Sequence, residues 1–367
     1  MPRFVADGFR NGRPFAVIAL LSILGAGHPA RNSAALARRA FVDGRHRGMC
    51  YAHSLMPGSG YGSHESARSL QRLRDMGVNW ISVTPFGFQG DPQGPTFGWV
   101  GNGKAGIAET DERVRGAIRQ ARALGINVMM KPHIWLPAPH WPGSIAPLAD
   151  SRASWFQTYE RFILHYALLS EEEGVGALCI GNELSKITAH EPEWRRLITA
   201  VRRVYSGALT YAAETDEVFR VPYWDALDFM GVNAYWPLAN AASPERRTLV
   251  EAWRPLATRL RNLSTRQGRM VVFTELGYRS APFGAWRHWE IPRTAPVDLR
   301  IQAEAYEAFF EAVWPQRWVG GVYWWKWFSH PGHSGTNSND FELENKPAEE
   351  VVAAHYLGRR VSSRRPS

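Results

Sequence analysis

Two glutamates in this sequence stand at the ends of apolar segments. The stretch VGALCIG (175–181) leads into Asn182 and Glu183, and MVVFT (270–274) leads into Glu275. A buried carboxylate is costly unless it is paired or required, so we expect both glutamates to have a chemical task. Two carboxyl groups facing one cavity suit glycoside hydrolysis, because one protonates the leaving oxygen while the other attacks the anomeric carbon or activates water.

Polar and aromatic side chains also end the other apolar runs. They are His53, Lys131, His133, Glu214, Asn233, Tyr235, Trp325, Lys326 and Trp327. We expect Lys131 and His133 either to contact a sugar directly or to form a hydrogen-bond network behind it. Glu214 is either a third acid of the site or a structural partner of Lys131 or an arginine.

Eight apolar runs with strand character must position these side chains. They span 48–53, 78–86, 126–135, 175–184, 209–214, 227–236, 270–278 and 319–327. Amphipathic stretches of helical period separate most of them, although the one between the fifth and sixth runs is short. Strands buried on both faces and alternating with helices predict a single (β/α)8 barrel, an α/β fold with its active site at the carboxyl ends of the strands. An open doubly wound sheet is the alternative, but no Gly-rich phosphate loop follows the first run.

Composition favours one large catalytic domain with additional segments at both ends. The formal net charge of the 367 residues is +9, and the whole excess lies in residues 1–46 and 358–367. Residues 47–357 are therefore formally neutral, which argues against nucleic-acid binding. We expect the catalytic domain to span 47–357 and the basic tail 358–367 to be disordered.

The N-terminal segment has the layout of a secretory signal. Residues 1–27 contain three arginines, the apolar run FAVIALLSIL and then small residues, and 28–46 are expected to form a linker. A first helix packed on the domain is the alternative. The apolar run is too short to cross a bilayer, so we expect no stable membrane insertion. We expect a secreted or periplasmic protein, and a monomer.

The remaining metal and redox candidates are weak. Cys50 and Cys179, the two cysteines of the sequence, fall on the first and fourth predicted strands, so we expect two buried free thiols rather than a disulfide. His330 and His333 are spaced like metal ligands but have no acidic or cysteine companion nearby. We therefore predict no metal, and the proposed chemistry requires no cofactor.

Several motifs resemble one family of glycosidases. GNEL (181–184) with TELGY (274–278) resembles the clan of retaining (β/α)8 glycosidases that carry Asn-Glu after strand four and a nucleophilic Glu after strand seven. More narrowly, the sequence is similar over 47–357 to glycoside hydrolase family 113, whose characterised members are retaining endo-β-1,4-mannanases. The segments that carry this likeness are MGVNWISVTPFGFQGD, AIRQARALGINVMMKPHIW, FMGVNAYWPL, VVFTELGYRS and NKPAEEV.

The resemblance implies roles for individual residues. Glu183 would be the acid/base and Glu275 the nucleophile. Asn182 would hydrogen-bond the sugar 2-hydroxyl, and Tyr235 would donate to Glu275.

Tryptophans are the candidate sugar-stacking residues. Trp325 is the expected platform under the reacting sugar, with Trp327 as the alternate. Trp99 and Trp135 lie in loops rich in Gly and Pro and are expected to contact the glycan, or else to form a hydrophobic plug that closes the barrel.

The resemblance therefore implies a retaining endo-glycoside hydrolase that cleaves β-1,4-mannan or glucomannan by double displacement, with a polysaccharide or oligosaccharide as its partner. The family tends to have a polar residue after KPH, whereas this chain continues IWLPAPHWPG (134–143). That difference, together with Lys104, Lys131, Lys326 and Arg279, leaves open an acidic or bacterial surface polysaccharide as substrate. A carbohydrate-binding pseudoenzyme is a further alternative, although a binder gains little from holding two carboxylates against their repulsion.

Overall fold

The computed structural model describes residues 41, 44–100 and 109–359. The predicted signal segment 1–27 lies outside these residues, as do most of the linker 28–46 and of the basic tail 358–367. No helix in the described ranges is long and apolar enough to cross a membrane.

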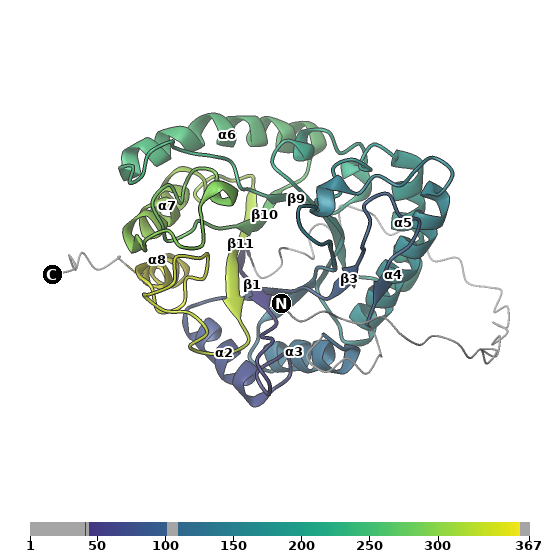
Figure 1. Ribbon diagram of the computed structural model, residues 1–367, viewed down its shortest axis with the longest axis horizontal. Coiled ribbons are helices and arrows are strands. Elements are labelled where there is room, and N and C mark those ends of the chain that lie inside the picture. Colours follow the sequence, from purple (N-terminus) through teal and green to yellow (C-terminus); the bar gives the residue numbers. More distant parts are fainter. Residues whose placement is uncertain (1–40, 42–43, 101–108, 360–367) are drawn as a thin grey trace. The chain divides into compact units, whose positions relative to one another are not determined.

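Eight parallel strands close into a barrel, with the helices around the outside (Figure 1). The strands are β1 (His46–Ala52), β2 (Trp80–Val83), β5 (Asn127–Met130), β7 (Ala177–Asn182), β8 (Ala208–Ala213), β9 (Met230–Asn233), β10 (Val271–Leu276) and β11 (Val319–Phe328). Their order around the barrel is β1-β11-β10-β9-β8-β7-β5-β2, so the first strand pairs with the last. The predicted (β/α)8 fold is confirmed.

Seven helices among the described residues cover the barrel. They are α2 (His64–Asp75), α3 (Asp111–Ala123), α4 (Arg152–Glu172), α5 (Glu191–Val204), α6 (Arg246–Gln267), α7 (Leu299–Ala312) and α8 (Pro347–Tyr356). Local signals fix their ends: the Ser63 side chain caps α2, the Thr110 side chain caps α3, and Gly268 ends α6 at a φ of 61°. Between β8 and β9 the chain forms only two 3-10 turns, Glu217–Phe219 and Trp224–Ala226, where the sequence indicated a short helix.

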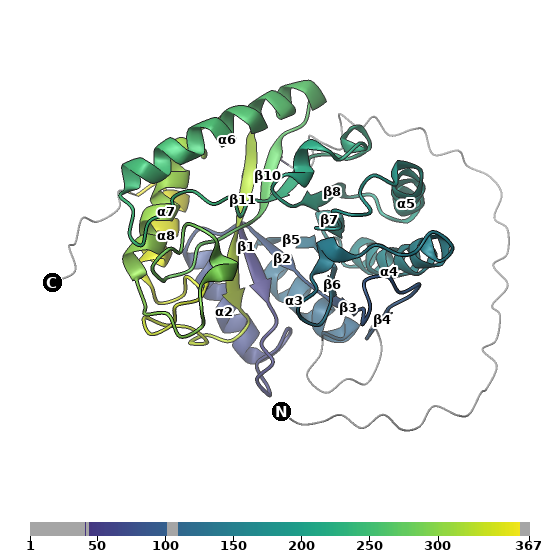
Figure 2. The same cartoon turned by 45° about the horizontal axis from the view of Figure 1, so that its top comes forward.

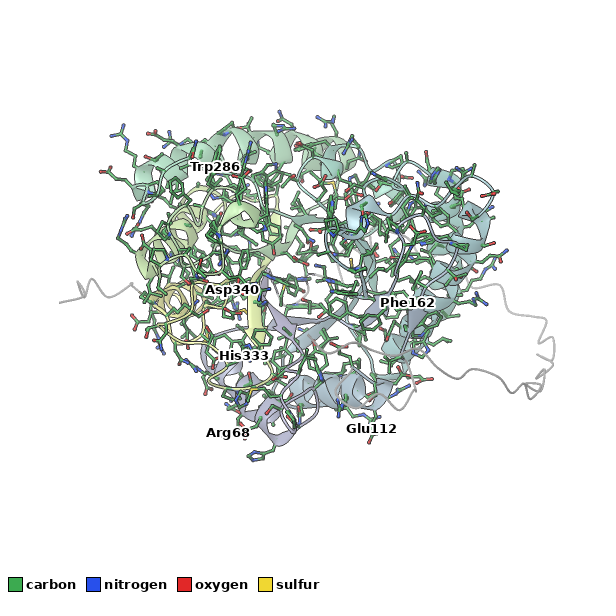
Figure 3. The ribbon with its side chains drawn as sticks, viewed as in Figure 1. Arg68, Glu112, Phe162, Trp286, His333 and Asp340 are labelled. Carbon is green, nitrogen blue, oxygen red and sulfur yellow. The ribbon has the colours of Figure 1, made fainter. Side chains whose placement is uncertain are left out.

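Alternate strand residues fill the inside of the barrel. The buried cluster they form includes Cys50, Trp80, Met129, Cys179, Phe229, Val272 and Tyr323. Cys50 and Cys179 are both free and buried, as predicted. Figure 3 shows side chains throughout the space within the ring of helices, with Phe162 of α4 and Asp340 of the loop after β11 on opposite sides of the barrel.

A small second sheet stands beside the barrel near α4 (Figure 2). It contains β3 (Phe86–Phe88), β4 (Gly98–Trp99) and β6 (His133–Trp135), with β3 between the other two. The sequence predicts single strands over 78–86 and 126–135, which extend from β2 to the first residue of β3 and from β5 through β6. Pro85 and Pro132 interrupt these runs because proline has no N–H for the ladder, and the chain then pairs anew in the second sheet.

Candidate active site

The carboxyl ends of the barrel strands, here called the mouth, bring together most of the predicted site residues. Glu183 follows β7, Glu275 lies near the end of β10, and Lys131 follows β5. Asn233 ends β9, with Tyr235 two residues further on. These side chains form one connected set of hydrogen bonds and ion pairs.

Glu275 is held by two donors. Its Oε1 forms an ion pair with the buried Lys131 Nζ, and its Oε2 accepts a hydrogen bond of 2.8 Å from the Tyr235 hydroxyl. Burial lowers the pKa of Lys131, but attraction to Glu275, Cys50 and Cys179 and the hydrogen bond to Glu275 together outweigh it, and the pKa is raised. Lys131 is therefore a cation that favours the ionised, oriented form of Glu275, as a nucleophile requires. The predicted contact between Tyr235 and Glu275 is present.

His133 completes this side of the site as a neutral group. Burial, reinforced by Lys131, holds the pKa of His133 well below its usual range. Its Nε2 lies 3.7 Å from Glu275 Oε1 and has no hydrogen-bond partner within the described residues. The His133 ring is nearly parallel to that of Trp325, with the centroids 6.4 Å apart.

Glu183 is in the opposite electrostatic state. Burial is the main cause that raises the pKa of Glu183 to about 8, and repulsion from Glu275 is the next. Its Oε1 accepts a hydrogen bond of 2.8 Å from Asn233 Nδ2. At neutral pH Glu183 is therefore mainly protonated beside an ionised Glu275, which is the division of roles that an acid and a nucleophile need.

Asn233 links the two sides of the site. Its Nδ2 donates to Asn182 Oδ1 at 2.9 Å as well as to Glu183, using both amide hydrogens. Its Oδ1 accepts from the Thr274 hydroxyl at 2.9 Å and faces Lys131 Nζ at 3.4 Å. The sequence analysis noted Asn233 only as a polar strand end. Its position after the buried run FMGV was the available signal, because an amide there needs partners on several strands.

The structure separates Trp325 and Trp327, the two β11 tryptophans predicted as sugar platforms. Trp325 lies beside His133 at the mouth, whereas Trp327 is fully buried and donates its indole N–H to Ser69 Oγ of α2 at 2.8 Å. The alternate platform role predicted for Trp327 is therefore wrong. The register explains this: Met49 pairs with Trp324 but Tyr51 pairs with Trp327, so β11 has one extra residue and its alternation of faces is broken.

Aromatic residues continue outward from His133 along the second sheet. Phe86 contacts the His133 ring edge-on at 5.5 Å, Phe88 lies 6.5 Å from Phe86, and Trp135 lies 6.2 Å from Phe88. We call Phe86, Phe88, His133 and Trp135 the aromatic strip. Phe88 and Trp135 are 44% and 50% exposed. The sequence analysis included His133 and Trp135 but missed both phenylalanines.

Trp99 does not join the strip. Its ring packs against Phe97 and against Phe162 and His165 of α4. The glycan contact expected of Trp99 remains a prediction, and its neighbours in the structure are those of a packed side chain.

A second group of aromatic side chains flanks Tyr235. His288 lies 5.0 Å and Phe341 6.1 Å from the Tyr235 ring, and Trp289, 60% exposed, contacts His288. The sequence analysis missed these residues because they come from the loops after β10 and β11, which carry no periodic pattern.

Glu214 is half-buried beyond the end of β8, and burial raises its pKa. Lys131 is paired with Glu275, so of the alternatives given for Glu214 the pairing with Lys131 is not formed. Within the described ranges, no group of three or more His, Cys, Asp or Glu side chains is arranged to hold a metal ion.

Fold and site together define the class. A (β/α)8 barrel that presents a protonated and an ionised carboxyl group at the carboxyl ends of its strands has the architecture of a glycoside hydrolase. The chain belongs to glycoside hydrolase family 113, whose family model matches residues 49–346. The resemblance seen in the sequence motifs is thereby confirmed.

Solved structures of similar proteins agree with this assignment. The family 113 β-mannanase of Alicyclobacillus acidocaldarius is 27% identical, with a TM-score of 0.75 over 86% of this chain and 98% of that one. A second family 113 β-1,4-mannanase is 23% identical, with a TM-score of 0.75 over 86% and 99% of the two chains.

More distant structures share the fold alone. A β-glucuronidase of Faecalibacterium prausnitzii has a TM-score of 0.58 at 12% identity, over 86% of this chain and 49% of that one. No protein with a curated description matches the chain.

Proposed function

We propose that this glycoside hydrolase is a retaining endo-enzyme that cleaves β-1,4-mannan or glucomannan. The observation that carries the mechanism is the pairing of an ionised Glu275, held by Lys131 and Tyr235, with a largely protonated Glu183. The substrate class is supported by the similarity to the A. acidocaldarius β-mannanase.

The two carboxyl groups would act in two steps. In the first, Glu275 attacks the anomeric carbon while Glu183 gives its proton to the departing oxygen, leaving a glycosyl ester on Glu275. Esterification removes the negative charge that helps to raise the pKa of Glu183, so this pKa falls. Glu183 is then suited to take a proton from the water that attacks the anomeric carbon, which breaks the bond from this carbon to Glu275 and frees the Glu275 carboxylate.

Two further contacts would fit a sugar to this pair. Asn182 has its oxygen fixed by Asn233, so its amide N–H2 group would donate to the 2-hydroxyl. Trp325 would lie under the reacting sugar, and the aromatic strip would stack on further sugar units. A strip that extends to the exposed Trp135 supports a polymer substrate and internal cleavage.

The test is release of reducing ends from β-mannan, glucomannan, galactomannan, cellulose, xylan and an acidic polymer, with wild type and Glu275→Ala. We expect wild-type release from the mannans and loss of at least about a thousandfold in Glu275→Ala, because no other group forms the ester. A rapid fall in viscosity would show internal cleavage, and proton NMR of the first product would show retention. Full activity in a folded Glu275→Ala variant would contradict the mechanism.

Two alternatives find less support. Of the basic residues that suggested an acidic glycan, Lys131 pairs with Glu275, Arg279 donates to Asn339 and to the Ile291 carbonyl, and Lys326 lies 3.8 Å from Glu342. Lys104 lies outside the described residues. For a binding protein without turnover, the opposite protonation states of the two glutamates would serve no purpose.

We further infer from residues 1–27 that the enzyme is exported to the periplasm or medium, and we propose separately that it is a monomer. Fractionation of the producing cells and size-exclusion chromatography test this. Recovery in the cytoplasm with residues 1–27 intact would contradict export, and elution at twice the mass would contradict the monomer.

A further inference from the structure

One buried carboxylate near the site has no part in the two-step chemistry. Glu217, in the 3-10 turn after β8, is 1% exposed. Its Oε1 accepts hydrogen bonds from the Thr188 hydroxyl and, at 2.6 Å, from the Tyr211 hydroxyl. Its Oε2 accepts from the Glu214 backbone N–H at 2.9 Å. Burial raises the pKa of Glu217, and the three donors offset part of the cost of burying its charged form, so this carboxylate is built into the fold.

The Tyr211 hydroxyl connects Glu217 to the acid/base. A hydroxyl has one proton, and Tyr211 directs its proton at Glu217. Its lone pair is therefore free to accept from the backbone N–H of Leu184, which lies 2.8 Å away. The single proton of the Thr188 hydroxyl is shared between Glu217 Oε1 and the Leu184 carbonyl, 3.0 Å away, so Thr188 lies between the carboxylate and the same backbone.

Leu184 directly follows Glu183, and the backbone there needs support. Glu183 has a φ of 54°, in the left-handed region. A non-glycine residue in such a conformation is strained and persists only where its surroundings hold it. Two backbone contacts do so: Glu183 N–H donates to the Ala212 carbonyl at 2.9 Å, and Leu184 N–H donates to Tyr211.

We propose that Glu217 is a positioning residue for Glu183, acting through the Tyr211 hydroxyl on the backbone that presents the Glu183 carboxyl group to the glycosidic oxygen. The kinetic consequence rests on the proposed function. Losing this anchor would let the backbone at Glu183 relax and displace the proton donor, while Glu275 and its partners stay in place.

Glu217 also contributes to the charge around Glu183. Besides burial, Glu275 of β10 and Glu217 raise the pKa of Glu183. Lys131 after β5 and Asn233 of β9 lower it. Tyr235 also lies nearby. Around Glu217 itself are Tyr211, Tyr223, Thr188 and Glu214. Replacing Glu217 by Gln removes one negative charge and should lower the pKa of Glu183.

Two variants and a matched control test the role. Tyr211→Phe removes the hydroxyl with little change in packing. Glu217→Gln removes the charge and replaces one acceptor oxygen by an amide N–H2 group, which then faces either the Glu214 N–H or the two hydroxyls. Glu173→Gln is the control, because Glu173 is also a buried carboxylate with several donors, Arg115 and Arg119, but lies at the end of α4. All three should melt below the wild type.

The kinetic measurement compares aryl glycosides with good and poor leaving groups. We expect Tyr211→Phe and Glu217→Gln to lose roughly tenfold or more in kcat/KM on the poor leaving group and much less on the good one, since only the former needs acid assistance. In Glu217→Gln the basic limb of the pH profile should also move to lower pH. Glu173→Gln should keep the wild-type ratio and the wild-type basic limb.

A second measurement needs no substrate. Carbon-13 NMR of protein labelled at the glutamate carboxyl groups follows the titration of Glu183, assigned by the signal missing in Glu183→Gln. We expect Glu217→Gln to lower the titration midpoint of Glu183. Tyr211→Phe should change this midpoint, and Glu173→Gln should leave it at the wild-type value. If Glu217→Gln does not fold, Tyr211→Phe decides alone.

The outcomes separate the two proposals. A wild type that releases nothing from any mannan contradicts the proposed substrate, while the titration still tests Glu217. An active wild type whose Tyr211→Phe and Glu217→Gln variants keep both the leaving-group ratio and the Glu183 titration would overturn the positioning role.

Discussion

At the scale of single residues, the site depends on keeping one glutamate charged and the other protonated. Lys131 and Tyr235 favour the anion of Glu275, and burial together with that anion keeps the proton on Glu183. Each state supports the other, so a change at one residue should be felt at its neighbour.

The raised pKa of Glu183 predicts two effects of pH. Activity should fall as pH rises through about 8, because the acid loses its proton. The free energy of unfolding should also fall as pH rises. The pKa of Glu183 in the folded protein lies above its unfolded value of 4.5, so the folded state binds this proton more tightly. The stability that this proton contributes is complete below pH 4.5 and is lost as pH rises through about 8. Glu183→Gln should therefore melt progressively higher than the wild type between pH 5 and 9. Parallel melting curves at all pH values would contradict the raised pKa.

The buried ion pair predicts a non-additive double variant. Lys131→Met leaves Glu275 buried without its cation, which should cost roughly 3–5 kcal/mol of unfolding free energy. Lys131→Met with Glu275→Gln removes both charges and should recover most of that loss while staying inactive. Urea unfolding of the four proteins gives the coupling, and additive losses would show that the two groups do not interact.

At the scale of elements, the second sheet gives the barrel a surface for a longer substrate. Trp135→Ala should raise KM for polymeric mannan several-fold and leave short aryl glycosides unaffected, because it removes one exposed stacking face far from the bond that breaks. Trp99→Ala tests the other predicted contact: because the Trp99 ring packs on α4, the variant should have a lower melting temperature, and a rise in KM would show that Trp99 also contacts the glycan. Equal KM changes on long and short substrates would argue against the strip as a glycan contact.

Sequence patterns predicted the strands, because buried strands that alternate with helices give periodic apolar residues. They also predicted Glu183 and Glu275, because these residues lie at the carboxyl ends of strands, where (β/α)8 barrels have their active sites. They did not predict features that depend on pairing between distant segments. The side to which Trp327 points follows from a register shift against β1, and the role of Asn233 follows from partners on three other strands or their ends.

At the scale of the whole molecule, closing the barrel requires the two ends of the catalytic domain to meet. Arg72 of α2 joins them: its guanidinium donates to Glu344 at 2.9 Å and to Glu349 of α8 at 2.6 Å, and it lies 5.0 Å from the Trp327 ring. Glu344 is 1% exposed, so removing Arg72 leaves a buried carboxylate with fewer partners.

Arg72→Ala should therefore lower the unfolding free energy by roughly 1–3 kcal/mol, the cost of an unsatisfied buried group. Arg68→Ala provides the matched control on the same helix, since Arg68 pairs with Glu65 at the surface, where such pairs contribute about 0–1 kcal/mol. Urea unfolding at fixed pH measures both, and kcat of the folded Arg72→Ala protein should stay near wild type because the mouth is untouched. Equal stability of the two variants would mean that the barrel closes through the β1 and β11 ladder alone, without help from the helices that flank it.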